Sequence, residues 1–273
     1  MGSEERMTNP EVKTVNVDFK RHYVHPISNE RVPSVTTILS SVAKPALVPW
    51  AAKTVAQYAV ENRETWAKPD DEAAIELIKN SHRRLSGQAM ALGSSVHSII
   101  EDLLRDKKVD FIPPDTQDLV RKAAELIETF KPKPTHIEVT VWSHKYQYAG
   151  SLDAIVEVAG KRYLFDWKTS SGVFPDYALQ CAAYAYADEI IKPDGGIEEL
   201  PHIDGFIIAH LPKDPKERWS VVPMDITQQD FDGFLAARAL FKWQQERSKI
   251  VVGPSLGTLD SFNSYNLRKG GET

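Results

Sequence analysis

The sequence of 273 residues contains a single cysteine, Cys181, so no disulfide can form within the chain. A four-cysteine iron–sulfur cluster is excluded for the same reason, and a small buried side chain is the expected role of this thiol. No apolar run is long enough to span a membrane. The residues Met1–Arg6 lack the apolar region of a signal peptide, and the sixth residue breaks the myristoylation pattern. We therefore expect a cytoplasmic protein with no membrane partner.

An excess of positive charge is also missing. The chain has 33 Lys and Arg residues against 38 Asp and Glu residues, which gives a net charge of −5. This balance argues against a protein that coats nucleic acid through bulk positive potential. It is compatible with a nuclease, because a carboxylate-rich metal site is itself negative and phosphate contacts can be local. With 42% hydrophobic residues, the chain has enough apolar material for one large domain.

The most informative pattern that is present is a predicted β-hairpin around Ala159-Gly160. If these two residues form the turn, Asp153 lies directly opposite Asp166. Glu157 then opposes Arg162, which independently supports this register. Alanine is imperfect in such a turn, because primed turns require positive φ.

Alternation along the two strands predicts one core face and one chemical face. The expected core face carries Leu152, Ala154, Val156, Val158, Tyr163, Phe165 and Trp167, and the expected chemical face carries Ser151, Asp153, Asp166 and Lys168.

Two carboxylates at such close range repel each other, so a proton or a cation is expected between them. Mg²⁺ or Mn²⁺ suits oxygen ligands of this kind, and the backbone carbonyl of Trp167 is a further candidate ligand. Lys168 reaches the same cluster and can orient or help deprotonate a bound water. The alternative is a solvated cluster on the sheet surface, which Gly150 at matching register disfavours.

Three motifs in this order carry a resemblance to a known family. Gly150–Asp153, Asp166–Lys168 and the Gln-x-x-x-Tyr pattern of Gln180–Tyr184 resemble the core of the PD-(D/E)XK nuclease superfamily, in its RecB-like branch. Gly93–His97 resembles the helix that supplies the histidine ligand in that branch.

The N-terminal region carries a looser resemblance. Tyr23, Val32–Leu39 and Trp50 are similar to phage-type exonucleases related to the mitochondrial genome maintenance exonuclease. The cysteines of the iron–sulfur cluster in several relatives are missing here.

The resemblance implies an α/β fold with a mixed central β-sheet flanked by helices, a restriction-endonuclease-like core, and an N-terminal α-helical insertion. Within a single domain we expect an extended or β segment over 1–48, a helical arch-like insertion over 49–92, the catalytic core over 93–250, and a flexible tail over 251–273.

The local patterns predict individual elements within this plan. Ser34 is an expected helix N-cap, and a helix that contains His97 is expected to start at Ser94 or Ser95. The other expected helices cover 35–41, 49–63, 70–85, 115–130, 175–191 and 228–248, and the expected strands cover 136–142, 205–211 and 219–224. In the first of these strands, Ile137, Val139 and Val141 are expected on one face.

The resemblance also assigns roles to single residues. His97, Asp153, Asp166 and the Trp167 carbonyl are expected to hold one or two Mg²⁺ or Mn²⁺ ions, and Lys168 is expected to position the nucleophile. Gln180, Tyr184 and Ser151 are expected to contact the DNA strand.

Two glutamates and a basic cluster have less definite roles. Glu101, one turn after His97, either fixes the histidine tautomer or helps to hold a second ion. Glu138 is a metal-site candidate, or else an ordinary glutamate on a polar strand face. Lys79, Arg83 and Arg84 form a basic cluster, which is either a solvated helix face or a contact for phosphates.

The expected function is metal-dependent hydrolysis of DNA phosphodiester bonds by an exonuclease that acts on single-stranded ends. The family suggests recombination, repair or replication in phage, with a recombination or replication protein as a partner and the host cytoplasm as the location. The alternatives are a DNA-binding adaptor with weak or no catalysis, and an endonuclease of the same superfamily.

Overall fold

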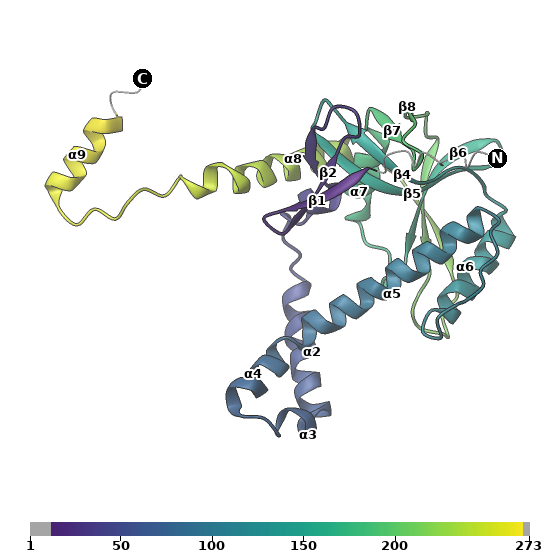
Figure 1. Cartoon of the computed structure of the whole chain (residues 1–273), viewed down its shortest axis with the longest axis horizontal. Coiled ribbons are helices and arrows are strands. Elements are labelled where there is room, and N and C mark those ends of the chain that lie inside the picture. The colour runs from purple at the N-terminus through teal and green to yellow at the C-terminus, as the bar shows by residue number, and fades with distance from the viewer. Residues whose placement is uncertain (1–11, 270–273) are drawn as a thin grey trace, which may run out of the picture.

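The computed structural model describes residues 12–269, and its centre is a seven-stranded mixed β-sheet (Figure 1). The strand order is β10-β9-β6-β5-β4-β7-β8, with β6 and β9 parallel and the other neighbours antiparallel. The strands are β4 (Lys133–Ser143), β5 (Tyr148–Val158), β6 (Lys161–Lys168), β7 (Glu189–Ile191), β8 (Ile197–Glu199), β9 (Gly205–His210) and β10 (Ser220–Met224).

Helices cover both faces of this sheet, so the expected mixed α/β fold is confirmed. On one face, α5 (Ser81–Leu104) and α6 (Gln117–Phe130) bury Ala154, Val156, Phe165 and Trp167. On the other, α1 (Val35–Leu39), α7 (Tyr177–Ala185) and α8 (Gln228–Gln245) bury Leu152, Ile155 and Leu164. The expectation of one core face and one chemical face is therefore wrong. Both faces are core, and the polar residues cluster at one end of the hairpin.

A three-stranded antiparallel sheet precedes the main one. It consists of β1 (Lys13–Val17), β2 (Lys20–Val24) and β3 (Arg31–Pro33), and Tyr23 and Val32 from it pack with Trp142 and Ile191. Ser34 follows β3 and caps α1 as predicted, because its side chain accepts a hydrogen bond from the Thr37 N–H at 3.0 Å.

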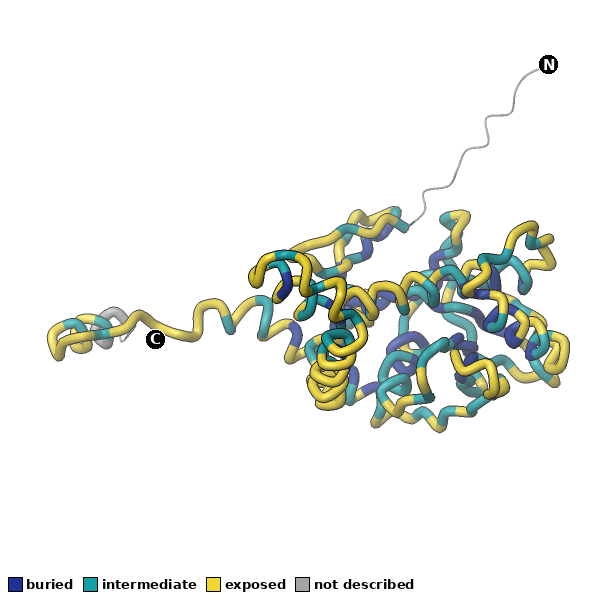
Figure 2. The backbone as a smooth tube through the Cα atoms, turned by 90° about the horizontal axis from the view of Figure 1, so that it is seen from below, coloured by how far each residue is buried: buried dark blue, intermediate teal, exposed yellow. Residues whose placement is uncertain are grey.

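The helical insertion stands away from the sheet (Figure 1), and most of its residues are exposed (Figure 2). It contains α2 (Leu47–Glu61), α3 (Arg63–Trp66) and α4 (Asp71–Lys79), with Asp70 as the N-cap of α4. The expected helix over 70–85 ends early, at Lys79, and the start expected at Ser94 or Ser95 is wrong.

Instead, α5 runs without interruption from Ser81 to Leu104 across the expected 92/93 boundary. Gly93 lies inside this helix, where the helix passes close to Thr169. A Cβ at Gly93 would be 3.3 Å from the Thr169 hydroxyl oxygen, so the small residue suits this close approach.

The helix expected over 175–191 is also shorter, since α7 ends at Ala185. The β-branched Ile190 and Ile191 belong to β7, which pairs with β4. Near the C-terminus, η1 (Arg247–Lys249) and α9 (Leu259–Lys269) follow α8, so the expected flexible tail contains a helix. The expectations that concern residues 1–11 and 270–273 lie outside the described residues. No helix within 12–269 is both long and apolar enough to cross a membrane.

Candidate metal centre and catalytic cluster

The β5–β6 hairpin has the predicted register. Its pairs run from Val158–Lys161 to Ala154–Phe165, and Glu157 faces Arg162. The turn residues Ala159 and Gly160 have φ of 51° and 77°, as a type I′ turn requires.

The strand pairing stops just before the two aspartates. Beyond the Ala154–Phe165 pair, the Trp167 N–H donates a hydrogen bond to the Asp153 carboxylate at 2.8 Å, where a continuing strand would offer a backbone carbonyl. The N–H and C=O of one strand residue point toward the same neighbouring strand. The Trp167 carbonyl is therefore directed to the Asp153 side, which suits its expected role as a ligand.

Asp166 lies in a hydrogen-bonded cluster that joins β6 to α7. Its carboxylate is 2.5 Å from the Lys168 ammonium and accepts a hydrogen bond from the Gln180 amide at 3.4 Å. Gln180 also accepts from Lys168 at 3.3 Å and donates to the Tyr184 hydroxyl at 2.8 Å. The residues expected to act on the substrate therefore share one network, and Asp166 is only 1% exposed.

Gly150 allows α7 to lie this close to the sheet. A Cβ at Gly150 would be 2.5 Å from the ring of Tyr184 and 3.1 Å from Val35. The glycine of the Gly150–Asp153 motif is thus explained by the close approach of the Gln-x-x-x-Tyr helix.

Next to this network, His97, Glu138 and Asp153 form a group suited to a cation. One ligand atom from each lies within 4.8 Å of the other two, and a His97 ring nitrogen is 3.5 Å from Asp153. Two carboxylates and an imidazole fit Mn²⁺ well and also fit Mg²⁺ with added water. Glu138, a less definite expectation from the sequence, is in this group, whereas Asp166 is held by Lys168 and Gln180.

Glu138 reaches the group because the backbone of β4 is irregular at this position. Its φ is 50°, and the paired residues pass from Ile137–Ala154 to Val139–Leu152, so the ladder is interrupted at Glu138 and Asp153. Ile137 packs on the α5/α6 side and Val139 on the α7/α8 side. The expectation that Ile137, Val139 and Val141 share a face is therefore wrong at Ile137, because a left-handed residue reverses the alternation.

Burial and crowded charge shift the pKa values of the acidic groups. Burial, together with the nearby Asp153 charge, raises the pKa of Glu138 to about 7. Burial raises the pKa of Asp166 to about 6, although Lys168 opposes this. Burial alone would raise the pKa of Asp153, but His97 and Lys168 hold it below its usual range.

The basic groups respond to the same carboxylates. Burial would lower the pKa of His97, but Asp153 raises it to about 9, and Asp166 and Asp153 likewise raise the pKa of Lys168. Glu138, Asp166 and His97 thus favour their protonated forms, and a divalent cation would replace protons there.

Ser151 and Glu101, which were also expected near the site, both interact with Glu138. Ser151 donates a hydrogen bond to Glu138 at 3.4 Å. Glu101 is ion-paired with Arg105 at 3.0 Å, and its charge contributes to the raised pKa of Glu138.

The basic cluster belongs to the helical insertion. Lys79 pairs with Glu76, Arg83 is exposed, and Arg84 donates to the Leu77 carbonyl at 2.8 Å and lies 5.0 Å from the ring centre of Tyr58. Two of the three side chains, Lys79 and Arg84, are therefore engaged within the insertion itself.

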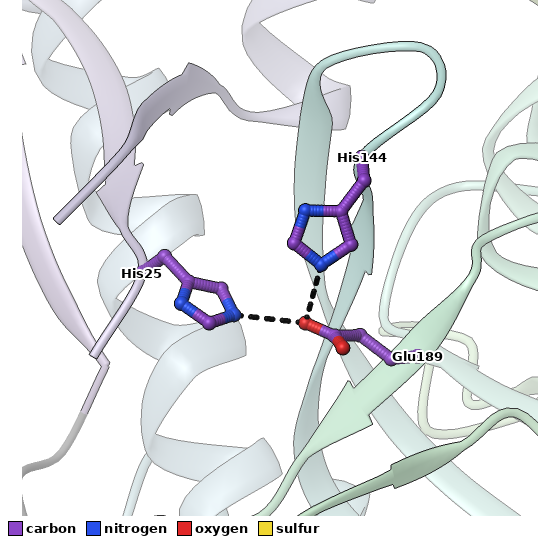
Figure 3. Close-up of side chains that lie close together, drawn as sticks. All are labelled: His25, His144 and Glu189. Carbon is purple, nitrogen blue, oxygen red and sulfur yellow. Dashed lines mark hydrogen bonds and ion pairs between the residues drawn. The ribbon is translucent and has the colours of Figure 1, made fainter. Parts of the chain in front are cut away.

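A second group of His and Glu residues was not expected from the sequence. His25, His144 and Glu189 lie together where the N-terminal sheet meets β4 and β7 (Figure 3). One Glu189 oxygen is 2.9 Å from His25 Nε2 and 3.0 Å from His144 Nε2. His25 and Glu189 are 164 positions apart in the chain, so no local pattern indicates the group.

The hydrogen bonds of His25 argue against a metal site in this second group. Its Nδ1 accepts from the N–H groups of Ile27 and Ser28 at 3.3 and 3.1 Å, so the proton of the neutral ring is on Nε2. That proton points to Glu189, whereas a metal-binding histidine presents a lone pair and donates its other N–H. We interpret this group as a link between the two sheets.

Compared with known proteins, the chain matches no family model and no curated protein.

Proposed function

We propose that the protein is a Mg²⁺- or Mn²⁺-dependent DNA exonuclease. The observation that carries the proposal is the adjacency of a His97–Glu138–Asp153 ligand group to the buried Asp166–Lys168 pair, at the end of one hairpin. An ordinary ion pair on a sheet surface would not explain the interrupted strand, the strained Glu138 backbone and the two raised carboxyl pKa values together.

His97, Glu138 and Asp153, with the Trp167 carbonyl, would hold the ion. A bound divalent ion lowers the pKa of water and offsets charge on a phosphate. Lys168 has its ammonium fixed by Asp166 and Gln180, so it can donate hydrogen bonds to a nucleophilic oxygen or to the phosphate. Gln180 lies beside it for positioning the strand, and the buried Tyr184 accepts a hydrogen bond from the Gln180 amide.

The preference for an exonuclease that acts on single-stranded ends comes from the family resemblance. Arg83 is exposed on the insertion, and in this proposal it contacts a phosphate of the strand. We extend the proposal to phage-type recombination, repair or replication, with a protein of that machinery as partner and a cytoplasmic location.

The test is digestion of end-labelled linear and closed circular DNA, single- and double-stranded, with Mg²⁺, Mn²⁺ or EDTA. We expect metal-dependent shortening of linear strands and no cleavage of circles. Lys168→Gln should abolish the activity and Lys161→Gln, an exposed lysine of the same strand, should retain it. Circular dichroism checks that Lys168→Gln is folded.

Two other outcomes would change the proposal. Cleavage of circles would make the protein an endonuclease. DNA binding without cleavage under any of these conditions would make it an adaptor.

A further inference from the structure

A cavity of about 650 Å³ lies beside the catalytic cluster. One wall is the segment 36–47, which contains most of α1 and the connection to α2, and the other is the segment 174–180, where α7 begins. Apolar and aromatic side chains dominate the lining, including Leu39, Leu47, Phe174, Tyr177 and Leu179. The volume is in the usual range for small-molecule sites.

Two residues belong both to the lining of the cavity and to the surroundings of Lys168. Gln180 lines the cavity and also contacts Asp166, Lys168 and Tyr184. The ring of Tyr177 lines it too, with the Lys168 ammonium 4.9 Å from the ring centre. An occupant of the cavity is therefore a direct neighbour of whatever binds at Lys168.

The lining matches a flat aromatic group better than a charged one. Phe174 is 43% exposed and makes a T-shaped pair with Tyr177, with ring centres 5.8 Å apart. The charged lining side chains Lys44 and Asp176 neutralise each other through a 2.7 Å ion pair that joins the two walls. A phosphate group therefore gains little here, whereas a base can stack on an aromatic face.

We propose that this cavity receives an unpaired nucleobase of the strand whose phosphodiester lies at Lys168. This inference rests on the proposed nuclease function and names its substrate class. The apolar walls accept any base, and a base inside a duplex cannot enter, so the cavity selects single-stranded DNA without sequence preference.

The first test measures kcat/KM on single-stranded oligonucleotides with Mn²⁺. Phe174→Ala should lower kcat/KM on normal DNA by about tenfold, since the base loses an aromatic ring on which it stacks. The substrates are normal DNA and a set with one abasic residue placed at each position near the cleaved bond. At one position the abasic residue should lower the wild-type rate similarly and remove the effect of Phe174→Ala. Phe111→Ala, which replaces another exposed phenylalanine, is the control. It should leave kcat/KM unchanged on normal DNA, and the abasic residue should affect it as it affects wild type.

A second readout does not need cleavage. DNA with 2-aminopurine near its end is mixed with the protein in EDTA or Ca²⁺, and its fluorescence should be quenched by wild type and by Phe111→Ala, but several-fold less by Phe174→Ala. Intact metal-dependent cleavage with no effect of Phe174→Ala in either assay would overturn the cavity assignment alone. Absence of cleavage would overturn the nuclease proposal, and quenching would then decide whether the cavity still binds bases.

Discussion

At the residue scale, the distinctive feature of the site is that three of its titratable groups have raised pKa values, whereas the pKa of Asp153 is lowered. Glu138, Asp166 and His97 have pKa values of about 7, about 6 and about 9, because burial and close negative charges favour bound protons. A group with a raised pKa stabilises the fold below its ordinary pKa and loses that contribution as the pH rises through the raised value. The metal-free protein should therefore lose stability as the pH rises through the raised pKa values of Asp166, Glu138 and His97.

A bound cation should reverse this trend, because it replaces the protons. We expect the free energy of unfolding in EDTA to fall between about pH 5 and about pH 9, and the stabilisation by Mn²⁺ to grow over the same interval. Urea denaturation with EDTA or Mn²⁺ at several pH values measures both. Glu138→Gln should reduce the slope in EDTA, and stabilisation by Mn²⁺ that shrinks as the pH rises would contradict the account.

The sequence predicted several of these residues for a clear reason. Asp153, Asp166 and Lys168 lie on two strands joined by a short turn, so their proximity follows from local register. The role of Glu138 was harder to predict, because its approach to His97 depends on a positive φ that no residue type near it demands.

At the scale of elements, β4 has an irregular backbone at Glu138, and this irregularity brings the Glu138 carboxylate close to His97 and Asp153. Glu138 at φ 50° carries a backbone strain that a glycine would relieve. Glu138→Gly and Glu138→Ala both remove the carboxylate, so the difference between them isolates the backbone. We expect the glycine variant to be more stable than the alanine variant by roughly 0.5–1 kcal/mol, which is the relief of strain less the flexibility cost of glycine.

Chemical denaturation of the two variants measures this difference directly. Both variants should also lose metal-dependent activity. An alanine variant as stable as the glycine variant would show that the backbone at position 138 is not strained.

The boundaries of elements were predictable only where a local signal marks them. Ser34 and Asp70 are side-chain caps, and the starts of the two helices that follow them were correctly predicted. The start of α5 has no side-chain cap, and Gly93 inside it looks like a helix break until its contact with Thr169 is known. The end of α7 is set by the pairing of β7 with β4, which is a tertiary constraint.

At the scale of the whole molecule, the site lies where separate parts of the chain meet. The hairpin supplies Asp153, Asp166 and Lys168, α5 supplies His97, β4 supplies Glu138 and α7 supplies Gln180 and Tyr184. The His25–Glu189–His144 link joins the N-terminal sheet to the seven-stranded sheet, near β4 and β7. The order of elements was predictable from patterns, whereas the meeting of α5 with the irregular part of β4 depends on packing.

The most direct test of the proposed metal centre is Mn²⁺ binding, measured by titration calorimetry at about pH 8, which lies above the raised pKa values of Glu138 and Asp166. We predict that wild type binds Mn²⁺, that Asp153→Asn weakens binding by at least about tenfold, as expected when a ligand is lost, and that His144→Ala binds like wild type. Binding that survives Asp153→Asn but is lost in His144→Ala would contradict the account, because it would place the ion at the His25–Glu189–His144 group.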